Sequence, residues 1–359
     1  MRVVPRSLIV CSALAFSLSA APPAHAQEPV SLSVLSYNIE GLPWPARTDR
    51  RPDLAHIAAQ LQQMRAAGQQ PQIVLFEEAF SRDARAIAAK AGYRYIADGP
   101  RASDAGARPT SVADRAFVAA AHFLSGETWG KWRGSGLRIA SDYPILDVRR
   151  MAYPAYACAG LDCLANKGVV LVTIAVPGVS QPVAIIDTHL NSRSAARVPA
   201  DRSFYAYRRQ VDALSDFVRA NIQPGAPFIV AGDFNAGQEP RRRDYLLQQA
   251  AGWRTSEPVR SALDTCLQEG DQCATANRPD LAFSQKRGRD YQLFASGESA
   301  NLTLQSMAAL FGHDASGRML SDHVGYAATY LIGNAPTFAS TLGETDAAPI
   351  RHGAVSAAR

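Results

Sequence analysis

The stretch Phe228-Ile229-Val230-Ala231-Gly232-Asp233-Phe234-Asn235 decides how the rest of the chain is interpreted. Four apolar residues that run up to a glycine predict a fully buried strand. Asp233 and Asn235 follow at its carboxyl end, and alternate residues of a strand share a face. A carboxylate and an amide in this position suit a phosphate or metal site, and an Asp/Asn turn is the common alternative. Other strand ends in the chain therefore decide between the two.

Both ends of the chain differ in composition from the middle. Two arginines, an apolar run at residues 8–21 and the small-residue pattern Ala24-His25-Ala26 predict a signal peptide at residues 1–26. The apolar run is short for a membrane anchor. Residues 336–359 are small, polar and unpatterned, which predicts a disordered tail. We therefore expect one domain at residues 27–335, in a secreted or periplasmic protein.

The charge balance of the chain is mildly basic. Its 37 Lys and Arg residues against 32 Asp and Glu residues give a formal net charge of +5, and the predicted signal peptide carries two of the arginines. A modest positive charge suits partners that carry phosphate groups or membrane surfaces, and it is as often only a solvated surface. No second apolar run of spanning length is present, so we expect a soluble mature chain.

Four cysteines remain outside the predicted signal peptide. An even number of cysteines in an exported protein predicts disulfides. Three pairings are possible, and the close spacing favours two local loops, Cys158–Cys163 and Cys266–Cys273. A zinc site is the alternative, and the absence of a nearby histidine at ligand spacing disfavours it.

Apolar patterning divides the middle of the chain into interleaved strands and helices. Apolar runs predict strands at residues 33–39, 73–76, 137–140, 169–176, 183–189, 228–231 and 324–331, with a further candidate at 280–283. Helical spacing predicts helices at residues 53–65, 81–91 and 202–220. Residues 98–115 are expected to form a surface loop, and residues 116–124 are open between strand and helix. Interleaved strands and helices predict α/β packing, with sheets covered by helices.

Polar side chains recur directly after the predicted strands. These residues are Asn38, Glu78, His189, Asp233, Asn235, Asp322 and His323. If the strands share one core, these groups converge on a set of carboxylates, amides and imidazoles. Mg²⁺ prefers carboxylates together with water and phosphate oxygens, and imidazoles suit acid–base work near neutral pH. Each residue alone is more often a surface or turn residue, but their repeated placement favours a site that hydrolyses phosphodiesters.

The motifs at these strand ends resemble those of the endonuclease/exonuclease/phosphatase superfamily, the fold of DNase I. The resemblance spans about residues 31–332 and implies that residues 27–335 form a catalytic domain. It implies a four-layer α/β sandwich with two central, mostly antiparallel sheets flanked by helices. The motifs that carry it are Ser36-Tyr37-Asn38-Ile39, Glu77-Glu78-Ala79-Phe80, Asp187-Thr188-His189-Leu190-Asn191, Gly232-Asp233-Phe234-Asn235, Arg278-Pro279-Asp280-Leu281 and Ser321-Asp322-His323.

Within that superfamily, the sequence is most similar to secreted bacterial neutral sphingomyelinases. This similarity is carried by Glu78-Ala79-Phe80, by Thr188-His189-Leu190-Asn191 and by the stretch from Cys158 to Asn166-Lys167-Gly168. The chain also departs from that group. Asn191 stands in place of the usual glutamine, Asp280 lacks the aromatic that commonly follows that aspartate, and no long apolar hairpin for membrane entry is evident.

The resemblance implies a metal and base region. Glu78 would be the principal ligand of Mg²⁺, with Mn²⁺ or Co²⁺ as substitutes, and Asn38 would lie beside it. His323 would act as the general base that activates water, and Asp280 would hold its ring in the correct tautomer. Asp322 would complete the metal and base region.

The resemblance also implies a phosphate and substrate region. Asp233 and Asn235 would orient the water or the phosphate, and His189 would contact the phosphate and stabilise its developing charge. Substrate-binding residues would be Asn191, Asn166 and Lys167.

These roles lead to a first hypothesis of a secreted, metal-dependent phosphodiesterase of the sphingomyelinase type, which releases phosphocholine from sphingomyelin. Its partners would be a phospholipid and a membrane surface, and we expect a monomer. Trp129 and Trp132 could lie at a lipid interface, face the choline group or simply pack together. The alternative is a secreted nuclease that holds nucleic acid through Lys and Arg. A third class, a binding protein that has lost catalysis, would not need both histidines and Glu78.

Overall fold

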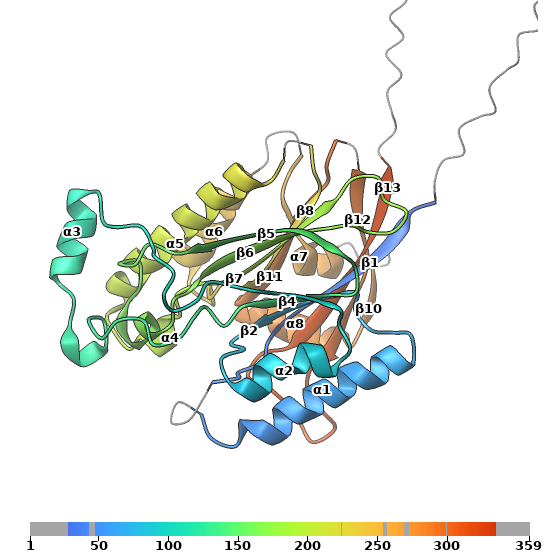
Figure 1. Cartoon of the computed structure of the whole chain (residues 1–359), viewed down its shortest axis with the longest axis horizontal. Coiled ribbons are helices and arrows are strands. Elements are labelled where there is room, and N and C mark those ends of the chain that lie inside the picture. The colour runs from blue at the N-terminus through green and yellow to red at the C-terminus, as the bar shows by residue number, and fades with distance from the viewer. Residues whose placement is uncertain are drawn as a thin grey trace, which may run out of the picture.

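The computed structural model describes residues 28–42, 47–223, 225–253, 257–268, 273–298 and 300–334. The predicted signal peptide and the predicted tail lie outside the described residues, so both stay predictions. Figure 1 shows the described part as two stacked sheets with helices on their outer faces. The helices are α1 (Arg50–Ala66), α2 (Arg82–Lys90), α3 (Val112–Ala119), α4 (Arg193–Ala196), α5 (Ala200–Asn221), α6 (Pro240–Ala251), α7 (Ala262–Gln268) and α8 (Arg278–Arg287).

The first sheet has the strand order β10-β12-β13-β1-β2-β4-β3. Its strands are β1 (Val30–Asn38), β2 (Ile73–Glu77), β3 (Tyr95–Asp98), β4 (Arg138–Ser141), β10 (Ala274–Ala276), β12 (Ala300–Phe311) and β13 (Gly325–Asn334). β1 runs parallel to β2 and antiparallel to β13. The carboxyl ends of β1 and β2 therefore meet the start of β13 at one edge of the sheet.

The second sheet has the strand order β5-β6-β7-β8-β11-β9. Its strands are β5 (Ile145–Ala152), β6 (Gly168–Ile174), β7 (Val183–His189), β8 (Phe228–Asp233), β9 (Arg260–Ser261) and β11 (Asp290–Ala295). β7 and β8 run parallel, with His189 opposite Asp233, and β11 runs antiparallel to β8. This order places the ends of β7 and β8 beside the start of β11.

The four-residue apolar run of β8 is explained by its two covered faces. Ile229 and Ala231 pack into the core between the sheets, and Phe228 and Val230 pack against α5 and α6 on the outer face. β1 shows the same alternation, because Val34 enters the inner core and Leu35 packs under α1 and α2. Burying one such side chain fully contributes about 1.5–3 kcal/mol. The predicted four-layer sandwich with two mostly antiparallel sheets is confirmed.

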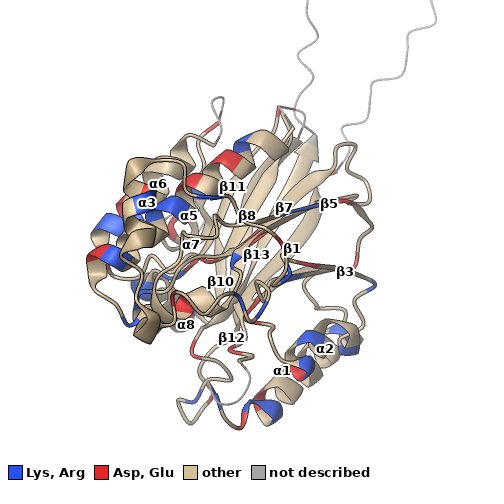
Figure 2. Cartoon of the chain, turned by 60° about the vertical axis from the view of Figure 1, so that its left-hand side comes forward, with Lys and Arg blue, Asp and Glu red and all other residues tan. Residues whose placement is uncertain are grey.

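α5 shows how an outer helix presents one apolar face to a sheet. α5 buries Tyr207, Val211, Leu214 and Val218, which are spaced three or four residues apart. Figure 2 shows that Lys, Arg, Asp and Glu lie mainly on the helices and loops, with both signs interspersed. Among the described residues, no helix is both long enough and apolar enough to cross a membrane.

Two disulfides join the cysteines in the pairing that their spacing favours. Cys158 bonds Cys163, which lies in the short 3₁₀ helix η2 (Gly160–Leu164), and Cys266 of α7 bonds Cys273, which follows that helix. Both predicted local loops are therefore confirmed.

The structure corrects two local expectations and adds one long strand that was not expected. Residues 280–283 lie in α8 and form no strand, because Pro279 occupies its first turn, where a missing N–H costs no hydrogen bond. The expected surface loop ends at Ser111, whose side chain and that of Asp114 form a capping box at the start of α3. The apolar runs do not predict β12, since its residues alternate between buried and exposed.

Candidate active site

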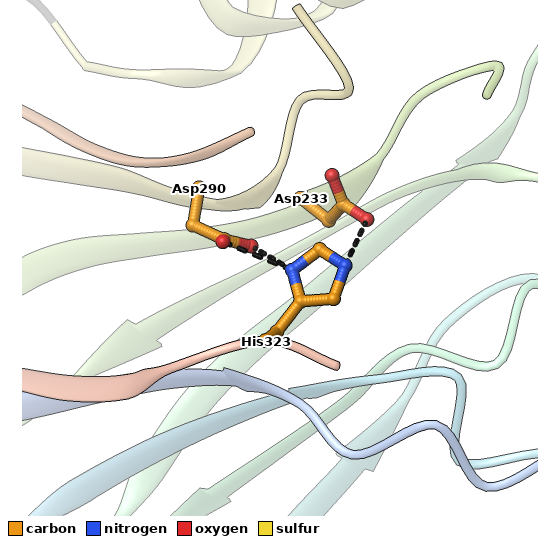
Figure 3. Close-up of side chains that lie close together, drawn as sticks. All are labelled: Asp233, Asp290 and His323. Carbon is orange, nitrogen blue, oxygen red and sulfur yellow. Dashed lines mark hydrogen bonds and ion pairs between the residues drawn. The ribbon is translucent and has the colours of Figure 1, made fainter. Parts of the chain in front are cut away.

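The imidazole of His323 lies between two carboxylates that come from neighbouring strands (Figure 3). Its Nδ1 is 2.8 Å from Oδ1 of Asp290, and its Nε2 is 3.7 Å from Oδ2 of Asp233. Asp290 begins β11 and stands opposite Asp233, the last residue of β8. All three side chains are buried. Because Nδ1 is engaged by Asp290, Nε2 is the ring atom that can exchange a proton with a substrate or water.

The two carboxylates also set the charge of His323. Burial disfavours the charged ring, but Asp290 and Asp233 outweigh it and raise the pKa of His323 to about 10. In the absence of a bound metal ion, the ring is therefore an imidazolium at neutral pH. The same carboxylates hold its orientation.

Asp280, which we expected to hold His323, pairs with another histidine. Its Oδ1 is 2.5 Å from Nδ1 of His313, and its Oδ2 accepts hydrogen bonds from Asn277 Nδ2 and from the backbone N–H of His313. This expectation is wrong in the structure, because the first turn of α8 directs Asp280 toward the loop after β12. Asp290 makes the expected contact instead.

Asn38 joins the two sheets at the site. Its Nδ2 donates to Oδ2 of Asp233 over 3.1 Å and lies 3.3 Å from Oε1 of Glu78. Its Oδ1 accepts the backbone N–H of Glu40 over 3.1 Å. Asn38 therefore acts as a donor that orients Glu78 and Asp233, and it would have to turn its amide to serve as the expected metal ligand.

Glu78 directly follows β2 with a backbone φ of 57°, in the left-handed region that non-glycine residues seldom adopt. This conformation turns the side chain toward Asn38. Burial raises the pKa of Glu78 to about 7, and His323, Asn38 and Lys167 act in the opposite direction. A carboxylate that is hard to ionise when alone gains most from a nearby cation.

His189 forms the other imidazole of the site. Its Nε2 is 3.0 Å from Nζ of Lys167 and 3.4 Å from Oδ2 of Asp233. Burial and the charge of Lys167 lower the pKa of His189 to about 3, so the ring is neutral at physiological pH. Its Nδ1 is buried and has no hydrogen-bond partner among the residues that the structure describes.

Lys167 brings a buried positive charge to the same place. Its Nζ pairs with Oδ1 of Asp162 at 2.8 Å and donates to the backbone oxygen of Leu190 over 2.8 Å. The structure thus places the predicted residue Lys167 beside His189.

Asn235 also has a left-handed backbone, with a φ of 49°. Its N–H donates to Oδ1 of Asp233, and its Nδ2 donates to the backbone oxygen of Leu190. Below it, the fully buried Arg242 donates through one nitrogen to the backbone oxygens of Asn191 and Asn235. Asn235 and Asp233 are therefore held as one rigid unit.

Two predicted substrate residues are used inside the protein. The side chain of Asn191 is fully buried, accepts the N–H of Ala159 and donates to Ser192 O and Ser203 Oγ. Asn166 donates to the backbone oxygens of Arg101 and Asp104. Neither amide faces the site, because both fasten loops.

Asp322 lies at the rim of the site, with its side chain 47% exposed. Its Oδ1 is 3.8 Å from Nε2 of His323, and its Oδ2 is 3.4 Å from Arg289. Arg287 also donates to its backbone oxygen. The structure therefore brings Asp322 to the predicted region, next to two arginines.

The family of the chain follows from a match to a family model. The model described as the endonuclease/exonuclease/phosphatase family matches residues 35–323, from β1 to the histidine between the two carboxylates. The chain belongs to the endonuclease/exonuclease/phosphatase family. The predicted superfamily is therefore confirmed. No curated protein sequence matches the chain significantly.

Solved structures share this fold at low sequence identity. Sphingomyelinase C from Streptomyces griseocarneus is 19% identical with a TM-score of 0.57, over 85% of this chain and 99% of that one. Beta toxin from Staphylococcus aureus, in a form with bound magnesium ions, is 19% identical with a TM-score of 0.54, over 83% and 99%. TDP2 from D. rerio with a single-strand DNA product is 15% identical with a TM-score of 0.51, over 84% and 98%. At these identities the likeness shows the fold alone.

The donors around Glu78 fit a hard divalent cation of the kind that this family uses. Glu78 is half-buried, so a cation can still reach it, and the buried part of its surroundings raises its pKa. Asn38 links the carboxylates of Glu78 and Asp233 by donating to both. A second group, Asp233, Asp290 and His323, has ligand atoms within 4.8 Å of one another. In that group the His323–Asp290 contact is a hydrogen bond, and because Mg²⁺ prefers oxygen ligands, the oxygen donors around Glu78 fit this ion better.

The sequence motifs do not predict Asp290 as a neighbour of His323. A signal for it was present in the sequence, because Asp290-Tyr291 has the aromatic that commonly follows this aspartate and Asp280-Leu281 lacks it. The apolar residues Leu293 and Phe294 that follow are typical of a buried strand.

Proposed function

We propose that the chain is a divalent-metal-dependent phosphodiesterase that works outside the cytoplasm and releases phosphocholine from sphingomyelin. The observation that carries the proposal is the His323–Asp290 pair, which faces Asp233, Asn38 and Glu78 at the edge where the two sheets meet. When water attacks phosphorus it gives up a proton, and when the bond from phosphorus to the ceramide oxygen breaks, that oxygen takes up a proton from the protonated base or from solvent. Both changes need charge stabilisation.

The proton acceptor in this proposal is Nε2 of His323. Asp290 fixes the tautomer and stabilises the ring once it is protonated. Asp233 lies on the other side of the ring and, together with Asn235, positions the attacking water. The ring must be neutral before it takes the proton, and bound positive charge beside the carboxylates lowers its pKa.

Phosphate binding falls to His189 and Lys167. The buried ammonium of Lys167 lies 3.0 Å from Nε2 of His189 and would contribute a positive charge beside a non-bridging oxygen. Asp162 and Leu190 O hold the lysine in place, so this stabilisation requires little rearrangement during the reaction.

Glu78 would hold a Mg²⁺ ion, for which Mn²⁺ or Co²⁺ could substitute, with Asn38 orienting the carboxylate and Asp322 completing the region from the rim. When bound, the ion would neutralise phosphate charge and polarise the phosphorus–oxygen bonds.

The location and the extent of the enzyme are part of the proposal. Two disulfides suit an oxidising compartment, and the predicted signal peptide at residues 1–26 leads there. We propose residues 27–335 as the catalytic domain, followed by a disordered tail at 336–359, and a monomeric protein. The sphingomyelinases among the solved structures motivate the lipid substrate.

A nuclease is the second candidate. Arg287 and Arg289 lie beside Asp322 and His323 and are partly exposed, as a phosphate-backbone contact requires. TDP2, which shares the fold, is solved with a single-strand DNA product.

One assay separates the two candidates. The mature protein is incubated with sphingomyelin vesicles and with plasmid DNA, each with Mg²⁺ and with a chelator. The proposal expects phosphocholine release that needs metal and disappears in His323→Ala. Plasmid nicking without phosphocholine release would establish the nuclease, and inactivity of the folded protein on both would refute the proposed chemistry.

A further inference from the structure

One stretch supplies most of the large apolar side chains that the described part of the chain leaves exposed. Six of eight such side chains come from residues 112–132, and the other two are Ile96 and Leu146. The side chains of Leu124 and Trp132 are 92% and 61% exposed. We call Phe123, Leu124, Trp129 and Trp132 the aromatic patch. A contiguous exposed apolar patch marks an interaction site more often than scattered residues do.

The rings of the aromatic patch pack against one another. Trp129 stacks on Trp132 with centroids 5.6 Å apart, and Phe123 meets the edge of Trp129 at 5.9 Å. Trp132 Nε1 donates to the backbone oxygen of Trp129. Because the two indoles stack on each other, they leave no cage between them for a choline group. Their exposed edges instead form one broad surface.

The aromatic patch is braced from below. Glu127 accepts the backbone N–H groups of His122 and Gly160 and pairs with Arg202 of α5 at 2.7 Å. The N–H of Trp132 donates to the backbone oxygen of Leu164 over 2.8 Å. In Figure 1, α3 and the chain after it project from the end of the sandwich near α4. The surface is therefore preformed, and binding to it loses little conformational entropy.

The loop at residues 158–164 braces the aromatic patch and also supports Lys167, which is proposed to bind phosphate. Lys131 Nζ lies 3.4 Å from Sγ of Cys158, at the disulfide with Cys163. Asp162 of the same loop pairs with Lys167, which contacts His189. A surface bound to the aromatic patch is thus fixed relative to the catalytic groups.

Charge distinguishes between possible occupants of the aromatic patch. Glu127 is the only acidic residue at positions 115–134, and Arg202 neutralises it, whereas Arg115 and Arg133 of the same stretch are exposed. Trp together with Lys or Arg is typical of the interface between lipid headgroups and acyl chains. A second copy of the chain would bring the same cations face to face across a two-fold axis, which disfavours a dimer.

We propose that the aromatic patch docks the protein on a phospholipid bilayer, with the indoles at headgroup level and the exposed Arg133 near the phosphates. The bilayer as a source of substrate rests on the proposed function. The docking itself is a property of the surface and can be tested without turnover.

The test is co-sedimentation with vesicles of sphingomyelin, phosphatidylcholine and a minor share of phosphatidylserine, in chelator. The double variant Leu124→Ser/Trp132→Ser is compared with the wild type and with Leu146→Ser, a matched change at an exposed leucine on β5. We expect the wild type and Leu146→Ser to bind the vesicles equally well. We expect the affinity of the double variant to be at least about tenfold lower. Thermal melting of all three proteins checks that they fold equally well.

Hydrolysis of a soluble phosphocholine ester, measured in parallel, separates docking from the proposed function. Selective loss of vesicle binding in the double variant supports docking, whether or not the ester is cleaved. Equal binding by all variants, no binding by the wild type, or patch-dependent dimers in light scattering would overturn it. Cleavage of the ester without vesicle binding would leave the proposed chemistry standing and refute the docking surface alone.

Discussion

His323 Nδ1 lies 2.8 Å from Oδ1 of Asp290, a residue that stands opposite Asp233 in the ladder between β8 and β11. The ring is held between two strands of the second sheet, although His323 itself precedes β13 of the first sheet. This relationship ties the two sheets together at the site, and it makes the geometry of the base depend on their relative position.

The His323–Asp290 contact predicts a large difference between two aspartates. Asp290→Asn removes the acceptor that fixes the tautomer, so we expect kcat to fall about 10²- to 10⁴-fold. Asp280→Asn is the matched comparison, because Asp280 contacts His313, and we expect kcat to change far less. Steady-state kinetics on one phosphodiester substrate measures both. A larger loss in Asp280→Asn would restore the assignment of Asp280 as the partner of His323.

Metal binding is predicted to depend on pH through Glu78. With a pKa of about 7 in the absence of metal, the Glu78 carboxylate is mostly protonated at pH 6 and mostly ionised at pH 8. Proton competition should therefore make Mg²⁺ binding about tenfold tighter at pH 8 than at pH 6. Isothermal titration calorimetry at the two pH values measures this. In Glu78→Gln the affinity should be weak and should lose this dependence, and an unchanged affinity would exclude Glu78 as the ligand.

Lys167 is predicted to keep His189 neutral. Lys167→Gln removes a buried positive charge 3.0 Å from Nε2, so the pKa of His189 should rise from its low value of about 3. The same change leaves Asp162 without its ammonium partner, which should lower the free energy of unfolding by several kcal/mol, about 3–5 for a fully buried pair. Imidazole NMR titration and urea unfolding report the two effects. A His189 pKa that does not move would show that burial alone depresses it.

Glu77 and Asp187 predict an unusual dependence of stability on pH. These fully buried carboxyls come from facing strands, β2 and β7, and burial raises the pKa of each well above its ordinary value. The folded state then holds protons that the unfolded state releases above about pH 4, so this pair makes stability fall as pH rises from there.

Asp187→Asn tests that pair. The change removes one ionisable group, so the free energy of unfolding at pH 8 should rise by about 1–3 kcal/mol, and its decline with pH should become shallower. Urea unfolding between pH 5 and pH 9 measures both, with Asp147→Asn, on exposed β5, as the control. A steeper decline in Asp187→Asn would contradict the prediction.

Local sequence patterns are enough to predict the layers of the fold and most of the residues that meet at the site. Uninterrupted apolar runs such as Phe228–Ala231 require two covered faces, and polar residues at their ends, including Asn38, Glu78, His189 and Asp233, must then meet at the sheet edge. The spacing of the cysteines predicts the two disulfides, because cysteines five and seven residues apart can meet across a short loop.

The tertiary structure alone decided which side chains became partners. Asp280 and Asp290 each precede apolar residues, but Pro279 starts a helix at the first, and the ladder with β8 places the second beside His323. Asn191 lies next to the site in sequence and is buried away from it. Local pattern fixes the face and the end of a strand on which a residue lies. Its partner depends on strand register and on the packing of one sheet against the other, which are set by contacts far apart in the chain.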